Sequence, residues 1–357
     1  MDAVRAEKPR LSVVIAASDS ADAVASCLDS LGAINPHIEV IVAFASGRMV
    51  LGDLGRKVIR VPCPPRSDVH LLRKLGFDRS RGECVVFTED SERLGRGWID
   101  GWSGFVKNPG ISAATGPVEP GSRLSLVDWA VFFCEYAPFL PPMRGATPSR
   151  LAGNNFGVRR EVVEHNPANQ RGIRESDIHR TIAARGGIIV YASSAIVRHL
   201  RVYSLAEAIC GRLRFGFDFG AASGKGWQPH HRLIRIALGP LALASQVGRL
   251  VWTLLRKRRL GGNFVEAAPL TVALLTAWSV GEWLGWLRSI FFANDEEQRP
   301  NALRKRLAEP RPHDAVVDPS QSSLDHAKIT EAGLWKNGRN EQTLPKGTSS
   351  HLTLPPA

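Results

Sequence analysis

Three acidic side chains follow a short apolar segment in the first third of the chain. Glu89, Asp90 and Glu92 come directly after residues 84–88, Cys-Val-Val-Phe-Thr. A hard divalent cation takes oxygen ligands from one or two carboxylates, and phosphate oxygens can complete its shell. Such a cation neutralises the charge that builds up on a diphosphate leaving group. The pattern favours a metal–diphosphate site, and the alternative is an acidic turn in solvent.

Two adjacent asparagines form a second group of polar side chains. Asn154 and Asn155 follow Gly153, and Arg159 and Arg160 come shortly afterwards. Asparagine amides both donate and accept hydrogen bonds, which suits sugar hydroxyls. A polar turn that caps the next helix explains the pair equally well.

A third group is acidic and stands where a helix is expected to begin. Glu175 and Asp177 flank Ser176 after Arg174. A carboxylate here could accept the proton of an acceptor hydroxyl. The alternative is structural, because the helix dipole favours acidic residues in the first turn.

His199 closes an extended segment of the chain. Histidine at such a position can serve as a metal ligand or contact a phosphate. A lone histidine is more often structural, so both interpretations stay open.

The segments that position these residues alternate between strand and helix patterns. Strands are predicted from β-branched apolar runs, and helices from capping residues followed by helical spacing of apolar residues. The predicted strands cover 11–17, 38–45, 57–63 and 83–90, and the predicted helices cover 21–34 and 67–82. This order indicates an α/β fold with a mostly parallel sheet and helices on both faces. Ligands in such sheets bind beyond the carboxyl ends of the strands, where the acidic segment stands.

The remainder of the chain divides into three parts. Residues 151–163 are predicted as a strand or loop that leads into a short helix, 176–187 as a helix, and 188–200 as an extended run. Apolar stretches, tryptophans and arginine clusters dominate 204–292. The polar segment from 294 is predicted to be mostly disordered. The predicted domains are 1–200, 201–292 and 293–357.

Composition narrows the class of partner. The 357 residues carry a net charge of +12, which favours anionic partners. The five cysteines are scattered and form no C-x-x-C pair, so a disulfide framework or zinc site is not expected. The polar start MDAVRAEKPR lacks an apolar signal core. We therefore expect the main domain to lie in a reducing cytoplasm.

Four segments, in this order, resemble the family 2 glycosyltransferases. Residues 11–31 are similar to their first strand and helix. Residues 71–98 look like their central stretch, in which an arginine-bearing helix precedes an acidic strand end and a Gly-Trp pair. Residues 151–163 resemble their acceptor-side segment, and 174–199 resemble their acidic helix start, glycine, strand and terminal histidine. The resemblance covers about residues 10–200 and implies a GT-A-like fold.

The resemblance also implies roles for individual residues. Asp90 and Glu92 would occupy the D-x-D metal site, binding Mg²⁺ or Mn²⁺. Glu175 falls where the family places its catalytic carboxylate, counted back from Gly186, and Asp177 is its close competitor. The residues implied to bind the nucleotide-sugar donor are Ala17, Asp19, Arg73, Glu89, Asp90, Asn154, Asn155 and His199.

Two positions depart from the family pattern. The second strand usually ends in acidic residues that bind the nucleotide base, whereas here Ala43, Phe44 and Ala45 stand in their place. The presumed base is also a glutamate rather than the usual aspartate. The resemblance therefore leaves the nucleotide and the assignment of the base open.

The expected function is transfer of a sugar from a nucleotide-diphosphate donor to a hydroxyl of a glycan or lipid-linked acceptor. The resemblance implies inversion at the anomeric carbon, in glycan or glycolipid synthesis for the cell envelope. One alternative is a catalytically inactive protein that binds nucleotide sugars, since the acidic residues near Phe44 are missing. Another is a basic nucleic-acid-binding protein, although we expect no nucleic-acid partner.

The apolar region 201–292 is predicted to associate with a membrane. A span needs about 20 apolar residues. The candidates are 233–255, which is interrupted by Arg235, Gln246 and Arg249 and contains Pro240, and 267–287, which contains Glu282. A hairpin of the two would carry the basic residues 256–259 across the membrane, against the positive-inside bias. We therefore expect helices that lie on the cytoplasmic membrane surface, the alternative being helices that span the membrane. For the basic and aromatic segment 212–227, a helix that packs on the main domain is a further alternative.

Overall fold

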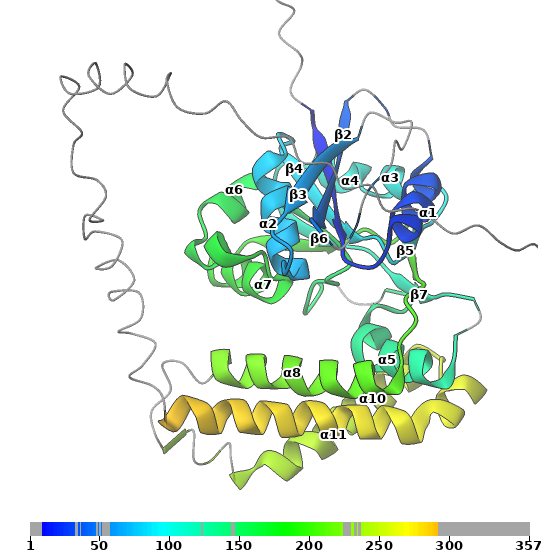
Figure 1. The fold of residues 1–357 in the computed structure, drawn as a ribbon, viewed down its shortest axis with the longest axis vertical. Helices are drawn as coiled ribbons and strands as arrows, with labels where there is room; N and C mark the ends of the chain where they lie inside the picture. Colours follow the sequence, from blue (N-terminus) through cyan, green and yellow to red (C-terminus); the bar gives the residue numbers. More distant parts are fainter. Residues whose placement is uncertain are drawn as a thin grey trace, which may run out of the picture. The chain divides into compact units, whose positions relative to one another are not determined.

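A computed structural model describes residues 9–291, apart from 33–34, 36, 48, 50, 52–57, 123, 144–146, 224–229, 232–233 and 235–236. The predicted α/β class is confirmed: a mostly parallel sheet lies between helices (Figure 1). A layer of apolar helices follows the last strand in the chain. The tail from 293 that we predicted to be disordered lies outside the described residues.

The strands and helices follow the predicted alternation. The strands are β1 (Leu11–Ala17), β2 (Ile38–Ala45), β3 (Ile59–Cys63), β4 (Cys84–Glu89), β5 (Glu92–Leu94), β6 (Ile111–Thr115), β7 (Val118–Pro120), β8 (Asn155–Arg159), β9 (Ile188–Tyr191) and β10 (Val197–His199). The helices are α1 (Ala21–Leu31), α2 (Val69–Arg79), α3 (Trp98–Gly101), α4 (Ser103–Lys107), α5 (Leu126–Tyr136), α6 (Arg160–Glu164), α7 (Glu175–Ala184), α8 (Leu205–Ser223), α10 (Gly239–Arg256) and α11 (Gly262–Phe291), with 3₁₀ turns η1 (Ala137–Phe139) and η2 (Pro167–Arg171).

Seven strands form the main sheet, in the order β3-β2-β1-β4-β8-β6-β9. All neighbouring pairs are parallel except those of β8, which runs antiparallel to β4 and β6. The amino end of β8 therefore lies at the same edge as the carboxyl ends of the parallel strands, and Thr88 stands opposite Asn155. This reversal brings the asparagine pair to the acidic end of β4.

A smaller sheet has the order β5-β10-β7. The extended run that we predicted over 188–200 is in fact two strands in different sheets, β9 and β10, joined by a turn. In the smaller sheet Glu92 of β5 lies directly opposite His199 of β10. Two residues 107 positions apart are thereby brought into contact.

Local signals explain where the first helices begin and how closely they pack. The Ser20 hydroxyl accepts a hydrogen bond from the Ala23 N–H, and the Asp68 carboxylate accepts one from the Leu71 N–H. Both are N-caps, as the sequence indicates. A Cβ at Gly76 would lie 2.5 Å from Cγ1 of Val14, so only glycine lets α2 approach β1 this closely.

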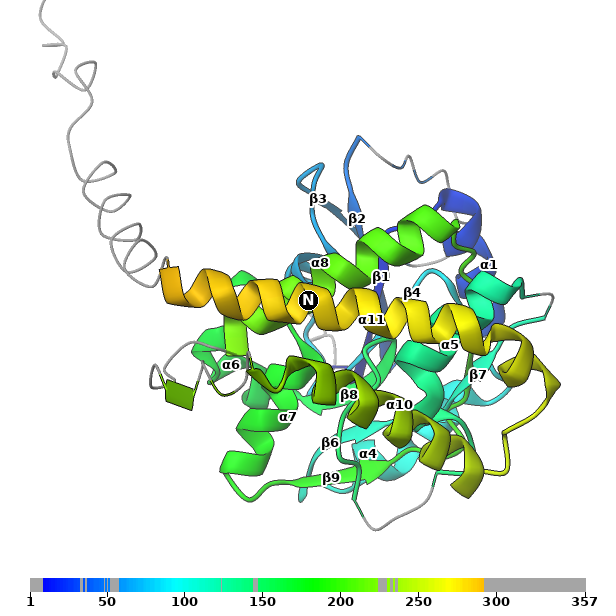
Figure 2. The ribbon, with the colours of Figure 1, turned by 90° about the horizontal axis from the view of Figure 1, so that it is seen from below.

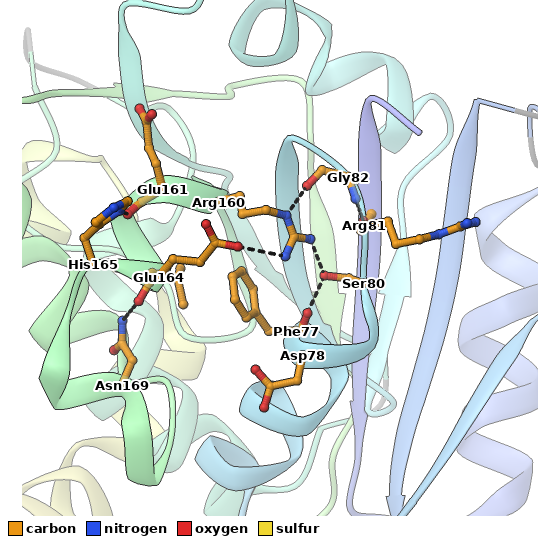
Figure 3. A network of polar contacts seen from close by, with 12 residues as sticks. Phe77, Asp78, Ser80, Arg81, Gly82, Arg160, Glu161, Glu164, His165 and Asn169 are labelled. Atoms are coloured by element: carbon orange, nitrogen blue, oxygen red, sulfur yellow. Dashed lines mark hydrogen bonds and ion pairs between the residues drawn. The ribbon is translucent and has the colours of Figure 1, made fainter. Parts of the chain in front are cut away.

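The two arginines behind the asparagine pair are structural. Arg160 donates hydrogen bonds to the Gly82 carbonyl and the Ser80 hydroxyl, and its guanidinium lies 4.7 Å from the Phe77 ring centre (Figure 3). Arg159 donates to four backbone carbonyls, those of Phe105, Val106, Asn108 and Ile111. Together they fasten β8 and α6 to neighbouring segments.

The helices α8 and α11 are in direct backbone contact. A Cβ at Gly216 of α8 would lie 2.2 Å from the Trp278 carbonyl oxygen, and one at Gly281 of α11 would lie 2.0 Å from that of Leu213. Gly220 and Gly285 make equally close approaches. Paired small residues four apart are typical of tightly packed apolar helices.

The helical layer α8, α10 and α11 lies across the molecule when it is viewed from below (Figure 2). Contacts between α11 and α5 join this layer to the α/β part, including a ring contact of Phe264 with Phe133. Among the described residues, the segment 262–288 of α11 is long and apolar enough to cross a membrane, and about a quarter of its most apolar window (28%) is buried. The core helix of a soluble protein meets the same criteria of length and composition.

Candidate active site

The candidate site lies at the edge where β1 and β4 end and β8 begins. Asp90, 2% exposed, follows β4, and its two carboxylate oxygens accept hydrogen bonds from the backbone N–H groups of Ser18 (3.1 Å) and Asp19 (2.8 Å). The carboxylate thus holds the turn after β1 against the end of β4. Burial raises the pKa of Asp90 to about 6, and the two N–H donors oppose this rise.

Arg73 joins two of the predicted acidic residues. This buried guanidinium of α2 donates to Glu89 Oε1 at 2.8 Å and to Glu175 Oε2 at 3.1 Å. Glu89 ends β4 and Glu175 begins α7, so one side chain connects three elements. The Glu175 side chain keeps 30% of its surface exposed, against 14% for Glu89. Glu175 is therefore the more accessible of the two carboxylates.

The ionisation of these carboxylates differs. Burial raises the pKa of Glu89, and Arg73 only partly offsets the rise. Burial also acts to raise the pKa of Glu175, but Arg73 and His70 outweigh it, so the pKa is lowered. His70 lies beside them, with Nδ1 3.4 Å from an Arg73 nitrogen. Glu175 is therefore a carboxylate at neutral pH, as a proton acceptor must be.

A second cluster forms around Glu92. His199 Nδ1 lies 2.6 Å from Glu92 Oε1, and the same oxygen accepts a hydrogen bond from the Asn154 amide at 2.8 Å. All three residues are buried. Burial lowers the pKa of His199, but the Glu92 carboxylate outweighs this, and the net pKa is raised. His199 and Glu92 thus form a buried pair in which the protonated form of the imidazole is favoured.

Residues of α5 and of the segment after the last strand complete this cluster. Tyr203 places its hydroxyl 3.3 Å from His199 Nε2, and the Tyr136 ring lies 4.8 Å from the imidazole. Arg201 lies 5.2 Å from the Tyr203 ring centre. Sequence reasoning missed Arg201 and Tyr203, and the signal for them was an Arg-Val-Tyr run two residues after the terminal histidine.

The remaining predicted residues are not all equally available to a ligand. Asn155 is fully buried, and its amide is bonded to Trp98, Pro117 and Ala195. Ala17 is a buried residue at the end of β1, opposite Phe44, so only its backbone stands at the edge.

Asp19, which was predicted to bind the donor, is exposed in the turn after β1, close to Asp90.

The two candidates for the catalytic base are placed differently. Asp177 pairs with the exposed Arg180 at 3.4 Å, one turn along α7. Glu175, in contrast, is joined through Arg73 to the end of β4. The contacts place Glu175 with the other predicted site residues.

The side chains at this edge supply some, but not all, of the ligands that a divalent cation requires. Within the described residues, no three His, Cys, Asp or Glu side chains are grouped so that they could hold a metal ion. The buried oxygens of the described residues that make no hydrogen bond nevertheless include Ser91 Oγ, Glu92 Oε2 and Asn154 Oδ1. Oxygen ligands of this kind suit Mg²⁺ or Mn²⁺. A cation here would take one or two carboxylates from the protein and its other ligands from a bound diphosphate.

Comparison with known proteins gives matches only among solved structures. No protein-family model and no curated protein matches the sequence. Mannosyltransferase PcManGT from Pyrobaculum calidifontis, in complex with GDP-Man and Mn²⁺, is 16% identical and has a TM-score of 0.47. The match covers 77% of this chain and 87% of that one.

A second similar structure is glucosyl-3-phosphoglycerate synthase from Mycobacterium tuberculosis, in complex with Mn²⁺, UDP-glucose and phosphoglyceric acid. It is 18% identical, with a TM-score of 0.38, and the match covers 57% of this chain and 75% of that one. A mycobacterial protein is 19% identical over 59% of this chain and 74% of that one, with a TM-score of 0.40. These are distant likenesses.

The sheet order defines an α/β fold with a mostly parallel sheet and an acidic edge. Its main features are the parallel strands β3-β2-β1-β4, the reversed β8 and the small sheet that carries Glu92 and His199. The predicted fold is therefore confirmed at the level of class.

Proposed function

We propose that this protein is a glycosyltransferase of the family 2 type, which moves a sugar from a nucleotide-diphosphate donor to an acceptor hydroxyl with inversion. The observation that carries the proposal is the convergence of Glu89, Asp90 and Glu175 at one sheet edge, from the end of β4 and the start of α7. Ligands of open α/β sheets bind at this edge.

The donor is proposed to lie against the ends of β1 and β4. Asp90 holds the turn that contains Ser18 and Asp19, so the backbone there has a fixed geometry for a nucleotide. Phe44, at the end of the neighbouring strand, is partly buried against the core. An apolar side chain thus stands where acidic side chains would otherwise contact the base, which leaves the identity of the nucleotide open.

Charge on the departing diphosphate is proposed to be balanced by Arg201 and the cluster around His199. Burial lowers the pKa of Arg201, but the Tyr203 hydroxyl and the carboxylates of Asp19, Glu89 and Asp90 raise it overall. The guanidinium is therefore a fixed positive charge at the acidic edge. A divalent cation, held by Asp90 or Glu92 and the donor, would add Lewis-acid stabilisation of the leaving group.

Glu175 is proposed as the general base toward the acceptor hydroxyl. Its carboxylate is ionised, partly exposed and held in place by Arg73. General base catalysis typically contributes 10²- to 10⁴-fold to a rate. Asp177 is the less favoured candidate because it pairs with Arg180 on the helix surface. The acceptor is proposed to be a glycan or a lipid-linked molecule.

A screen of nucleotide sugars tests the proposal. We expect one or more nucleotide diphosphate sugars to raise the melting temperature in a thermal-shift assay with Mn²⁺ or Mg²⁺, since ligands that bind the folded state stabilise it. Donor hydrolysis with the same compounds separates an enzyme from an inactive sugar-binding protein. If no nucleotide, nucleotide sugar or cation changes the melting temperature, the site does not bind the proposed donor.

A further inference from the structure

The exposed apolar side chains of this protein are concentrated in the region of the helical layer. Of the large apolar residues that the structure describes as exposed, all but Leu126 and Ile188 lie between residues 202 and 284. On α10, Leu241 (64% exposed), Trp252 (57%) and Leu255 (54%) recur at helical spacing. They share one outward face, because α10 contacts α11 on its other side, where Gln246 donates to Ser279.

Positive charge accompanies this apolar face. Residues 219–265 contain eight Lys or Arg and no Asp or Glu. Arg249, Arg258 and Arg259 are exposed on or directly after α10, and the Arg256 guanidinium lies 4.4 Å from the Trp252 ring centre. The α10 face is defined here by Leu241, Trp252, Leu255, Arg249, Arg258 and Arg259. Apolar and cationic side chains are thus interleaved without an acidic one.

We propose that the α10 face docks on an anionic phospholipid bilayer. Aromatic and aliphatic side chains enter the boundary between headgroups and acyl chains, while arginines remain at the phosphates. The α10 face therefore matches a surface that is both negative and apolar. This inference concerns attachment and does not depend on the proposed transfer reaction.

A second copy of the chain is a poorer occupant of this face. In a symmetric dimer the same patch meets itself, so its arginines would be buried without an acidic partner. A nucleic acid would satisfy the charge but would leave the aliphatic Leu241 and Leu255 against phosphate and water. Lipid satisfies both kinds of side chain.

The structure favours a helix layer that lies on the bilayer over one that crosses it. The helix α11 contacts the α/β part, where Cys134 donates to the Thr271 carbonyl at 3.7 Å and Phe133 packs on Phe264. It also contacts α8 through Gly281 and Gly285. A helix held on two sides by other elements is covered by protein in part, and we assign the bilayer contact to α10 because its exposed face combines apolar side chains with arginines.

Vesicle co-sedimentation of the full chain tests the proposal. We expect binding to vesicles of phosphatidylcholine with phosphatidylglycerol, at least tenfold weaker binding to phosphatidylcholine alone, and loss of binding in high salt. Two double variants, Trp252→Ser with Leu255→Ser and Arg258→Asn with Arg259→Ser, should each weaken binding about tenfold. Asparagine is used at position 258 because the backbone there has a positive φ of 56°.

Matched controls exclude unfolding and general loss of charge. Leu126→Ser with Ile188→Ser removes two exposed apolar side chains elsewhere, and Arg79→Ser with Arg171→Ser removes two exposed arginines. Both control variants should bind vesicles like the wild type, and all variants should melt like it. Equal binding by wild type and α10-face variants, or no vesicle binding at all, would overturn the proposal. So would a dimer, or retention of an oligonucleotide, that the α10-face variants specifically abolish.

Discussion

At the scale of single residues, Arg73 is the side chain on which the candidate site depends. It is 2% exposed and bonds two carboxylates that come from different elements. A buried guanidinium can satisfy two carboxylates at once because its donors form a planar fork. Lysine has no such fork, so a lysine at this position should not bind both carboxylates as well as arginine does.

Replacement of Arg73 should destabilise the fold and free Glu175. We expect Arg73→Met to lower the free energy of unfolding by about 3 kcal/mol, since removal of one partner leaves carboxylates partly buried and unpaired. Arg79→Met, an exposed arginine on the same helix, should change it by less than about 0.5 kcal/mol. Urea denaturation measures both. Equal stability of the two variants would show that the Arg73 contacts are not formed.

Asp90 should make stability depend on pH in a recognisable direction. Its pKa is raised from the ordinary 3.8 to about 6, so the folded state holds this proton more tightly than the unfolded chain. The resulting stabilisation is complete below about pH 4 and is lost as the pH rises through about 6. Asp90→Asn does not titrate. Between pH 4 and pH 8, the free energy of unfolding of this variant should therefore rise relative to that of the wild type by up to about 3 kcal/mol.

This difference is measured by denaturation in EDTA, which removes bound cations. A constant difference between variant and wild type over this pH range would mean that Asp90 has an ordinary pKa. A shift in the opposite direction would mean that its ionised form is the stabilised one.

At the scale of elements, the sequence was sufficient for the strands and helices between residues 11 and 90. The β-branched run 11–17 and the capping residues Ser20 and Asp68 predicted β1, α1 and α2 within a few residues. The reversal of β8 and the separation of β9 from β10 were not predicted. Strand direction and sheet membership depend on long-range pairing, which the short run 188–200 does not encode locally.

The contact between α8 and α11 requires glycine. Gly216→Ala and Gly281→Ala should each destabilise the protein by about 1–3 kcal/mol, because the added Cβ would overlap a backbone carbonyl oxygen. Gly248 of α10 has open space where a Cβ would stand, so Gly248→Ala should stabilise by about 0.5–1 kcal/mol. Thermal unfolding compares the three. If all three alanine variants are stabilised, the helices do not pack backbone to backbone.

At the scale of the whole molecule, the candidate site joins residues that are far apart in sequence. Arg73 and Glu175 are 102 positions apart, and Glu92 and His199 are 107 apart. The sequence suggested each of these residues separately, through acidic strand ends, a helix start and a terminal histidine. It could not show that Glu92 is bonded to His199, or that Asn155 is enclosed by Trp98. Those facts follow from how the two sheets meet.

The central claim is that Glu175 is the base of a sugar-transfer site, and one comparison tests it most directly. Transfer rate and donor affinity are measured for wild type, Glu175→Gln and Asp177→Asn with a donor from the nucleotide-sugar screen. We predict that Glu175→Gln slows transfer at least 100-fold while donor affinity stays within about threefold, since a base acts in the chemical step. Asp177→Asn should remain active. Full activity of Glu175→Gln together with loss of activity in Asp177→Asn would contradict the account.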